Sequence, residues 1–281
     1  MRALLFSLSL VFLLGQQPTL AMDLQFFLAT AQEHTEEGVK YYTGNGRPQD
    51  YARAVEHFKV AAERGDGTGQ LYYGTAFFFG YGVDQSYDRA RVWFLKSAEQ
   101  GIAEAQLNVG IMYDRGSGVK KDSHIALEWY KKAADQGLAS AQHNAGLLYL
   151  QGKAGPRDYG KALDMFHKAA EQNDSLSQYI IGYMHYKGKG VKRSFSNAAY
   201  WYEKAAENDL PAAKATLGIM HTFGLGVQLD TAKAVELLGI NKLTQNEPPL
   251  ASRIMSRVHQ LFPDATLPKS KDVRQKSNKK Y

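Results

Sequence analysis

The sequence predicts an all-α fold, an α/α solenoid of six 36-residue repeats that ends in a C-terminal capping helix. Three observations support this prediction: glycines recur every 36 residues, residues suited to starting a helix keep the same interval, and so does an alanine. A fixed period of this size is typical of solenoids, in which each unit buries its apolar face only by stacking on its neighbours.

Each repeat contains two short helices joined by a glycine-rich turn. A glycine inside the first helix recurs at Gly38, Gly74, Gly110, Gly146, Gly182 and Gly218. A second glycine, expected to end that helix, follows six residues later at Gly44, Gly80, Gly116, Gly152, Gly188 and Gly224. The second helix is expected to start after Asp50, Ser86, Asp122, Asp158, Ser194 and Asp230. The recurring alanine lies inside it, at Ala54, Ala90, Ala126, Ala162, Ala198 and Ala234.

Each recurring residue type suits its position. Asp and Ser side chains accept hydrogen bonds from the free N–H groups at the start of a helix. The second helices end at residues that tolerate the left-handed conformation of a C-cap. These residues are Gly65, Gly101, Gly137, Asn173 and Asp209. A glycine inside a helix costs roughly 1 kcal/mol against alanine, so the glycine of the first helix indicates a place where two helix backbones pack closely.

Aromatic residues of the second helices are expected to fill the layer between the helices. They occur as a repeated position at Phe58, Phe94, Tyr130, Phe166 and Tyr202. Three of them have a tryptophan beside them, at Trp93, Trp129 and Trp201. We expect all three tryptophans to belong to the core.

At these positions the sequence resembles the Sel-one-like repeat family, which is related to the tetratricopeptide (TPR) repeats. The third copy matches the family pattern at Ala105, Val109, Gly110, Tyr113, Gly116, Gly118, Val119, Asp122, Ala126, Trp129, Tyr130, Lys132, Ala133, Ala134 and Gly137. The resemblance covers roughly residues 32–240. It implies a right-handed superhelix that serves as a binding scaffold. The sequence departs from the pattern at Ala154-Gly155 in repeat four and at Leu237-Leu238 in repeat six.

Residues 1–21 indicate a secretory signal peptide. Arg2 precedes an apolar run that is too short to span a bilayer, and Thr19-Leu20-Ala21 offers small residues for cleavage. The alternatives are an uncleaved anchor and an amphipathic first helix. We expect an exported protein, periplasmic or secreted, whose mature chain begins near Met22.

Residues 22–262 are expected to form the solenoid with its terminal capping helices. Asp23–Thr43 is expected to be one long helix that provides the first helix of repeat one, and Leu250–Phe262 to be the helix that shields the last repeat. Residues 263–281 form a basic tail. We expect this tail to be disordered, because it has almost no apolar residues to bury.

The distribution of charge along the sequence limits the kinds of partner that we expect the protein to bind. The formal net charge is +6, of which Lys269–Tyr281 supplies +5 and Arg2 supplies +1, so the repeat body is neutral. A nucleic-acid-binding protein needs a basic stripe on its folded face, so we expect no nucleic acid partner. We also expect a monomer that is not embedded in a membrane, with a basic tail suited to touching anionic surfaces.

No catalytic, cofactor-binding or metal-binding constellation is evident. Ser117-Gly118-Val119-Lys120 matches the S-x-x-K pattern of penicillin-binding enzymes, but the Ser-Asp-Asn and Lys-Thr-Gly partners of that pattern are missing. His185 and His221 share a repeat position that is aromatic in the other copies, which indicates packing. An envelope-acting enzyme, such as a weak penicillin-binding or β-lactam-hydrolysing protein, is the alternative to a non-catalytic scaffold.

We expect the scaffold to bind a protein or peptide through a concave groove lined by its first helices, as in tetratricopeptide-like units. The candidate partner-binding residues are Tyr72, Phe79, His143, Tyr179, Tyr183, Tyr186 and Lys187. Tyrosine is enriched at binding hot spots, which favours a role in recognition. The alternative is that these rings pack against neighbouring helices.

Overall fold

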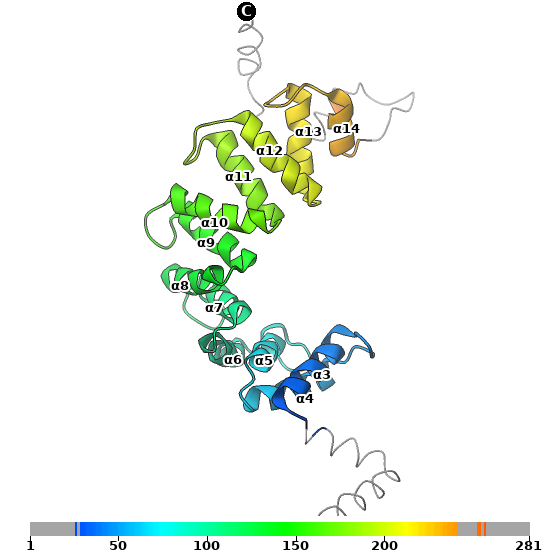
Figure 1. Cartoon of the computed structure of the whole chain (residues 1–281), viewed down its shortest axis with the longest axis vertical. Coiled ribbons are helices and arrows are strands. Elements are labelled where there is room, and N and C mark those ends of the chain that lie inside the picture. The colour runs from blue at the N-terminus through cyan, green and yellow to red at the C-terminus, as the bar shows by residue number, and fades with distance from the viewer. Residues whose placement is uncertain (1–25, 27–28, 241–251, 254–255, 257–281) are drawn as a thin grey trace, which may run out of the picture. The chain divides into compact units, whose positions relative to one another are not determined.

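The computed structural model describes residues 26, 29–240, 252–253 and 256 (Figure 1). Residues 29–240 contain twelve helices and no strand, which confirms the prediction of an all-α repeat fold. The first helices of the six repeats are α3 (Ala31–Thr43), α5 (Gly67–Phe79), α7 (Ala103–Arg115), α9 (Ala139–Gln151), α11 (Ser175–Lys187) and α13 (Pro211–Phe223). The second helices are α4 (Tyr51–Glu63), α6 (Tyr87–Glu99), α8 (Ser123–Asp135), α10 (Tyr159–Glu171), α12 (Phe195–Glu207) and α14 (Thr231–Leu237).

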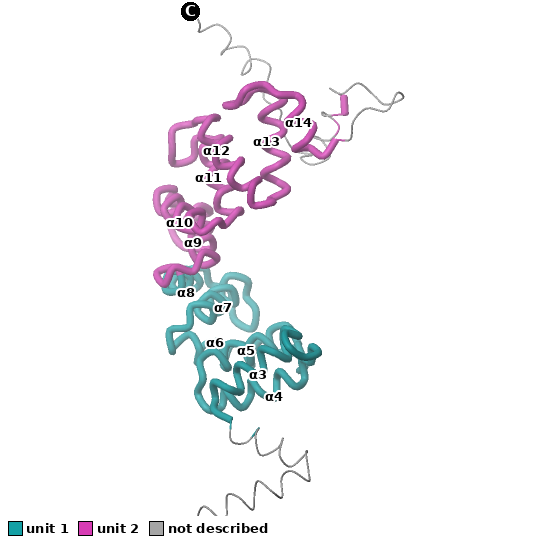
Figure 2. The backbone as a smooth tube through the Cα atoms, turned by 45° about the vertical axis from the view of Figure 1, so that its right-hand side comes forward, with its two compact units in different colours: residues 1–133 teal, residues 134–281 magenta. Residues whose placement is uncertain are grey.

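The chain forms two compact units, residues 1–133 and 134–281 (Figure 2). Within the first unit, helices that follow one another from α3 to α7 pack together, and α3 also contacts α5. Within the second unit the same succession of contacts runs from α9 to α14. Within each of these two stretches, a helix therefore packs against its neighbours in the chain, as expected for repeats that bury their apolar faces by stacking.

The predicted N-caps of the second helices are all present. Asp50 accepts a hydrogen bond from the N–H of Arg53, and its equivalents do the same at α6, α10, α12 and α14. At α8, Asp122 Oδ1 accepts from the N–H groups of His124 and Ile125, at 2.9 and 3.1 Å. These bonds satisfy backbone donors that have no partner within the helix.

The predicted C-caps are also confirmed. All six first helices end at a glycine with positive φ, between 61° and 81°. After the second helices, Asn173 and Asp209 adopt φ of 64° and 58°, the left-handed conformation that glycine adopts at the equivalent position of the earlier repeats. Asn and Asp are the residue types that visit this region with least strain.

In the first five repeats, the glycine inside the first helix is explained by an aromatic ring that rests on it, and in repeat six Leu238 takes the place of the ring at Gly218. A Cβ atom added at Gly146 would lie 2.7 Å from the ring of Phe166, twenty residues later in the same repeat. The same close approach joins Gly74 to Phe94 at 2.7 Å, and Gly182 to Tyr202 at 2.8 Å. The glycine therefore brings the backbone of the first helix against an aromatic ring of the second helix. The two helix backbones also approach closely, as predicted, because a Cβ added at Gly74, Gly110 or Gly182 would lie 3.2–3.3 Å from a backbone carbonyl oxygen of the second helix.

The three tryptophans lie at the edge of the core, which corrects the expectation that they belong inside it. Trp93, Trp129 and Trp201 are half-buried, and each packs against a cluster of fully buried residues. The aromatic residue that follows each tryptophan is the buried one. These residues are Phe94, Tyr130 and Tyr202.

Buried glutamines hydrogen-bond one repeat to the next. Gln142 Nε2 donates to the carbonyl oxygen of Ala134 at 3.3 Å, and its Oε1 accepts from Gln172 Nε2 at 3.0 Å. The same two bonds occur at Gln70, with Ala62 and Gln100, and at Gln178, with Ala170 and Asn208. Each of these glutamine side chains therefore joins the end of the preceding second helix to the end of the following one. We call this set of residues the glutamine ladder.

The first repeat differs from the sequence prediction at its start. Helix α3 begins at Ala31, after a break at residues 29 and 30, so Asp23–Thr43 is not one continuous helix. Thr30 and Glu33 form a capping box there, in which each side chain bonds the backbone N–H of the other residue. Of the predicted helix Leu250–Phe262, only residues 252, 253 and 256 are described, and each is helical. The signal peptide and the basic tail lie outside the described residues.

The contact between glycine and ring makes a specific prediction. We expect Gly146→Ala to destabilise the protein by about 1–3 kcal/mol, because the new methyl group would overlap the ring of Phe166. Gly160→Ala is the matched control, since its Cβ would meet only Asp158 Oδ1 at 3.4 Å. The control should be neutral or stabilising by up to about 1 kcal/mol. Urea unfolding of both variants measures the difference, and equal stabilities would contradict the explanation.

Candidate functional site

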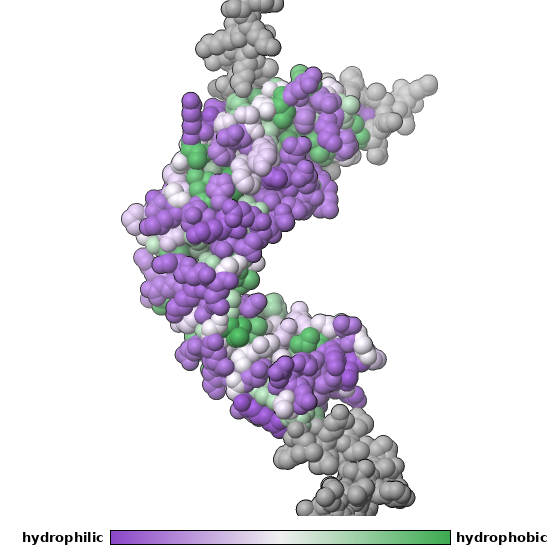
Figure 3. Space-filling view, viewed as in Figure 1, coloured by the Kyte–Doolittle hydropathy of each residue, from purple (hydrophilic) through white to green (hydrophobic). Residues whose placement is uncertain are grey.

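The predicted partner-binding residues fall on three first helices. Tyr72 and Phe79 are on α5 in the first unit, and His143 is on α9 in the second. The other four lie within nine residues of one another on α11, at Tyr179, Tyr183, Tyr186 and Lys187. In Figure 3, hydrophilic side chains cover most of the visible face of each unit, with smaller hydrophobic areas between them.

The two residues on α5 have different surroundings. Tyr72 is half-buried, and its ring stacks on Phe58 with centroids 4.9 Å apart and planes at 12°. This contact indicates a packing role. Phe79 is 55% exposed and stacks on Tyr81, with centroids 5.4 Å apart. Phe79 is therefore the α5 residue that remains accessible to a partner.

His143 belongs to a partly buried polar junction. Its Nδ1 lies 2.8 Å from Ser177 Oγ and 3.3 Å from Asp174 Oδ1. Burial raises the pKa of Asp174, but the hydrogen bonds from His143 and Ser177 outweigh this effect and leave the pKa below its usual range. Thr35 and Asp66, two residues at equivalent positions in the first unit, form a similar bond of 2.7 Å.

The Ser177–His143–Asp174 group does not have the geometry of a nucleophilic triad. In such a triad the serine and the carboxylate bond opposite nitrogens of the imidazole. Here both partners face the same nitrogen, Nδ1, and Ser177 has no exposed surface. Asp174 also caps α11 by accepting from the N–H of Ser177. The group links α9 to the start of α11 and holds His143 in place, and a role of His143 in binding a partner stays a prediction.

The α11 residues form the most coherent surface. Tyr179 packs against Tyr202 with centroids 5.1 Å apart, and its hydroxyl lies 3.4 Å from Thr216 Oγ1. Tyr183 accepts a hydrogen bond of 3.2 Å from Lys189 Nζ, and this ammonium group also lies over its ring. The three α11 tyrosines are half-buried and pack against the core of the second unit. They present fixed rings at the surface.

Two further residues complete this surface. Tyr186 packs against Phe195, the first residue of α12, with centroids 5.2 Å apart. Lys187 Nζ lies 5.2 Å from the centroid of the Tyr186 ring. Sequence reasoning missed Lys189 and Phe195, although the run of basic residues after α11 was a signal that could have indicated Lys189. We define the α11 surface as Tyr179, Tyr183, Tyr186, Lys187, Lys189 and Phe195.

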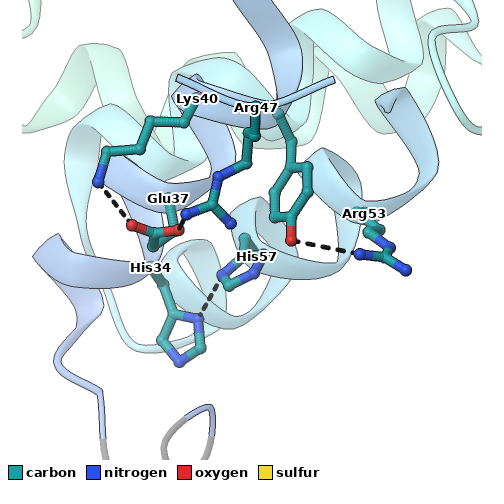
Figure 4. A network of polar contacts seen from close by, with 7 residues as sticks. His34, Glu37, Lys40, Arg47, Arg53 and His57 are labelled. Atoms are coloured by element: carbon teal, nitrogen blue, oxygen red, sulfur yellow. Dashed lines mark hydrogen bonds and ion pairs between the residues drawn. The ribbon is translucent and has the colours of Figure 1, made fainter. Parts of the chain in front are cut away.

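A polar network in the first repeat is a second cluster of titratable groups (Figure 4). His34 on α3 and His57 on α4 face each other with their Nδ1 atoms 3.1 Å apart. The ring of Phe26 contacts both imidazoles edge-on, with centroid distances of 4.6 and 4.9 Å. Among the described residues no group of three or more His, Cys, Asp or Glu side chains is placed to hold a metal ion.

Charged groups surround this histidine pair. Glu37 forms ion pairs with Lys40 at 2.6 Å and with Arg47 at 2.7 Å. Arg47 also lies over the ring of Tyr41, whose hydroxyl accepts from Arg53 at 3.4 Å. The network joins α3, the turn after it and α4, so it stabilises the first repeat.

Ser117 lies in the turn after α7, and its backbone N–H donates to the carbonyl oxygen of Met112. In the described part of the chain, no hydrogen bond connects its hydroxyl to a histidine or a lysine. Within the same residues, no helix combines the length and apolar character needed to cross a membrane.

Comparison with known proteins identifies the family. The Sel1 repeat model matches residues 25–66, 68–102, 103–138, 139–174, 175–210 and 211–239. The chain therefore belongs to the Sel1 repeat family, as the resemblance at Ala105–Gly137 predicted. Comparison with curated proteins finds no match.

Two solved structures are similar to this chain. One is a protective antigen present in uropathogenic Escherichia coli strains that displays an SLR fold, with 30% identity and a TM-score of 0.73 over 92% of this chain and 54% of that chain. The other is a Sel1 repeat protein from Oxalobacter formigenes, with 28% identity and a TM-score of 0.71 over 84% of this chain and 67% of that one. The chain thus spans about half the length of the first of these proteins.

The histidine pair predicts a loss of stability in acid. Burial, assisted by the neighbouring His34, lowers the pKa of His57 to about 4. An unfolded histidine has a pKa of about 6.5, so the unfolded chain binds more protons as the pH falls between these values. Stability should therefore drop from about pH 6.5 down to about pH 4, by about 1–2 kcal/mol once partial exposure is allowed for.

His57→Gln tests this prediction, because glutamine does not titrate. Unfolding free energies measured across that pH range should fall less steeply for the variant than for the parent protein. The same slope for both proteins would show that the pKa of His57 is not lowered in the folded state.

Proposed function

We propose that this chain is an exported, non-catalytic scaffold that binds a protein or peptide partner through the α11 surface. Sel1 repeat proteins are commonly interaction scaffolds, which supports the general class. The observation that carries the specific site is the gathering of Tyr179, Tyr183 and Tyr186 along one helix, next to Lys187. Tyrosine and tryptophan provide rigid contact area with few side-chain torsions to immobilise, so they dominate many interfaces.

The α11 surface is favoured over the other two candidate positions. His143 is held by Ser177 and Asp174, so it has little freedom to meet a partner. Phe79 is exposed, but Tyr72 on the same helix is stacked on Phe58. On α11, three rings are already fixed by their neighbours, which lowers the entropy lost when a partner binds.

Export is part of the proposal and rests on the composition of residues 1–21. A basic residue, an apolar run and small residues at Thr19-Leu20-Ala21 are the features of a cleaved signal peptide. The N-terminal sequence of the protein isolated from its own cells tests this. A chain that begins near Met22 would support export to the periplasm or the medium, and a chain that retains its first residues would contradict it.

Site-specific photocrosslinking tests the binding site. We would replace Tyr183 or Tyr186 with p-benzoylphenylalanine, express each variant in the native cells and irradiate. Both variants should give the same crosslinked protein, identified by mass spectrometry. The matched control is Tyr200 on α12, which is 52% exposed and lies outside the α11 surface.

The control variant, with p-benzoylphenylalanine at position 200, should not give this crosslinked protein. Crosslinking of the same protein from Tyr200 with equal yield would place the interface elsewhere. Failure of both α11 positions to crosslink any protein would contradict the proposed function. Each variant must first show the melting temperature of the parent protein, because the replaced rings also contact the core.

A further inference from the structure

The segment that joins α11 to α12 carries an unusual concentration of positive charge. Lys187–Ser194 contains four basic residues and no acidic one. We call Lys187, Lys189, Lys192 and Arg193 the basic turn. The equivalent segments of the first, second and sixth repeats contain at most one basic residue each, and every one of them contains an aspartate.

The absence of carboxylates extends beyond the turn. Residues 175–202, which include all of α11 and the first half of α12, contain no Asp or Glu. The N-cap of α12 is Ser194, where four of the other repeats place an aspartate. The amino end of a helix carries a partial positive charge, so α12 adds to the positive potential of the basic turn.

Three of the four basic side chains of the turn lie over aromatic rings. Lys189 lies over Tyr183 at 4.9 Å from the centroid, and Arg193 lies over Phe195 at 4.5 Å. Within the described residues, none of the four basic side chains takes part in an ion pair, although ten such pairs occur elsewhere. Lys187, Lys192 and Arg193 are exposed.

The acidic residues that border the basic turn are engaged elsewhere. Gly190 in the turn lies against Tyr159 at the start of α10. The adjacent Asp158 caps α10 and forms an ion pair of 3.3 Å with Lys161. On the other side, Gly226 of the segment between α13 and α14 lies against the backbone of Phe195, and Asp230 after it caps α14. The charge of the basic turn therefore remains available to a ligand.

Repeat three provides an internal comparison. Arg115, Lys120 and Lys121 occupy the positions equivalent to Lys187, Lys192 and Arg193, and all three are exposed. In repeat three, however, Asp114 and Asp122 stand where repeat five has Tyr186 and Ser194. Repeat five thus has the same three cations with an aromatic ring and a hydroxyl in place of two carboxylates.

We infer that the basic turn and the α11 surface together bind an acidic segment of the partner protein. The carboxylates of that segment would pair with Lys187, Lys192 and Arg193, and its apolar side chains would lie on the rings of Tyr183 and Tyr186. Charge complementarity of this kind accelerates association and excludes basic partners. The inference rests on the proposed function and specifies the chemistry of the partner.

An acidic protein segment fits this surface better than a nucleic acid or an anionic membrane does. Nucleic acid presents a phosphate every few ångströms and is bound by a basic stripe, whereas the cations here are confined to one turn. A membrane-binding surface inserts exposed apolar side chains, whereas the rings at this surface are half-buried and are covered in part by lysine or arginine.

Fluorescence anisotropy with a defined probe tests the inference. The probe is a fluorescein-labelled peptide of repeated Glu-Phe-Asp-Leu units, and its control replaces every Glu by Gln and every Asp by Asn. The triple variant K187Q/K192Q/R193Q should bind the acidic probe at least about tenfold more weakly than the parent protein. The matched variant R115Q/K120Q/K121Q, which removes the equivalent cations of repeat three, should bind it like the parent. Binding should also weaken as salt is added.

Three results would overturn the inference. One is no binding of the acidic probe, or equal binding of the amide control. Another is an equal loss for the two triple variants. The third is tighter, basic-turn-dependent binding of an oligothymidylate or of phosphatidylglycerol vesicles, which would assign the turn to nucleic acid or to lipid.

A charge-reversed variant separates this inference from the proposed function. In K187E/K192E/R193E with p-benzoylphenylalanine at position 186, crosslinking to the native partner should be lost. If the crosslink persists, the scaffold function stands and the acidic chemistry is wrong. If position 186 gives no crosslink even in the protein with its native basic turn, the proposed function itself fails.

Discussion

The contact between a glycine of the first helix and an aromatic ring of the second is the interaction on which the first five repeats depend, and Leu238 takes the place of the ring in the sixth. The ring of Phe166 can lie against α9 only because Gly146 has no side chain. Once the ring is in place, the helix pair has a fixed separation, and the capping residues fix where each helix begins and ends. Positions that carry neither the ring contact, a cap, the buried alanine nor a residue of the glutamine ladder are then free to vary.

These constraints explain where the repeats differ from one another in sequence and charge. The last residue of the first helix and the turn that follows it are outside the ring contact, and their charge differs widely between copies. Repeat five uses this freedom for Lys187, Lys189, Lys192 and Arg193, whereas repeat six places Leu225 and Leu229 in the equivalent segment. The framework thus holds a variable surface at a constant place in every unit, which is how repeat scaffolds acquire specific partners.

Local chemistry made most of the fold predictable. The caps, the turn glycines and the period follow from side chains acting on their own backbone, so Asp50 or Gly116 could be assigned without a structure. The burial of the tryptophans could not be predicted in this way. Trp129 and Tyr130 are adjacent aromatic residues, and which of them is buried depends on Gly110, which lies twenty residues earlier in the chain. The contacts of Tyr72 and His143 could not be predicted for a similar reason, since Phe58 and Asp174 lie outside the helices that carry these two residues.

The glutamine ladder also limits the lengths of duplications and deletions that the repeat array can accept. Gln142 hydrogen-bonds Ala134 at the end of the preceding second helix and Gln172 after the following one. Gln178 makes the equivalent pair of bonds one repeat later. The second, fourth and fifth repeats therefore offer the same donors and acceptors to their neighbours. A duplication or deletion of a whole number of 36-residue repeats keeps this register, whereas a length that is not a multiple of 36 moves the glutamines away from their partners. Repeat one has His34 in place of the glutamine, and His34 contacts His57 of the same repeat, so a copy of repeat one placed inside the array would lack the glutamine bonds.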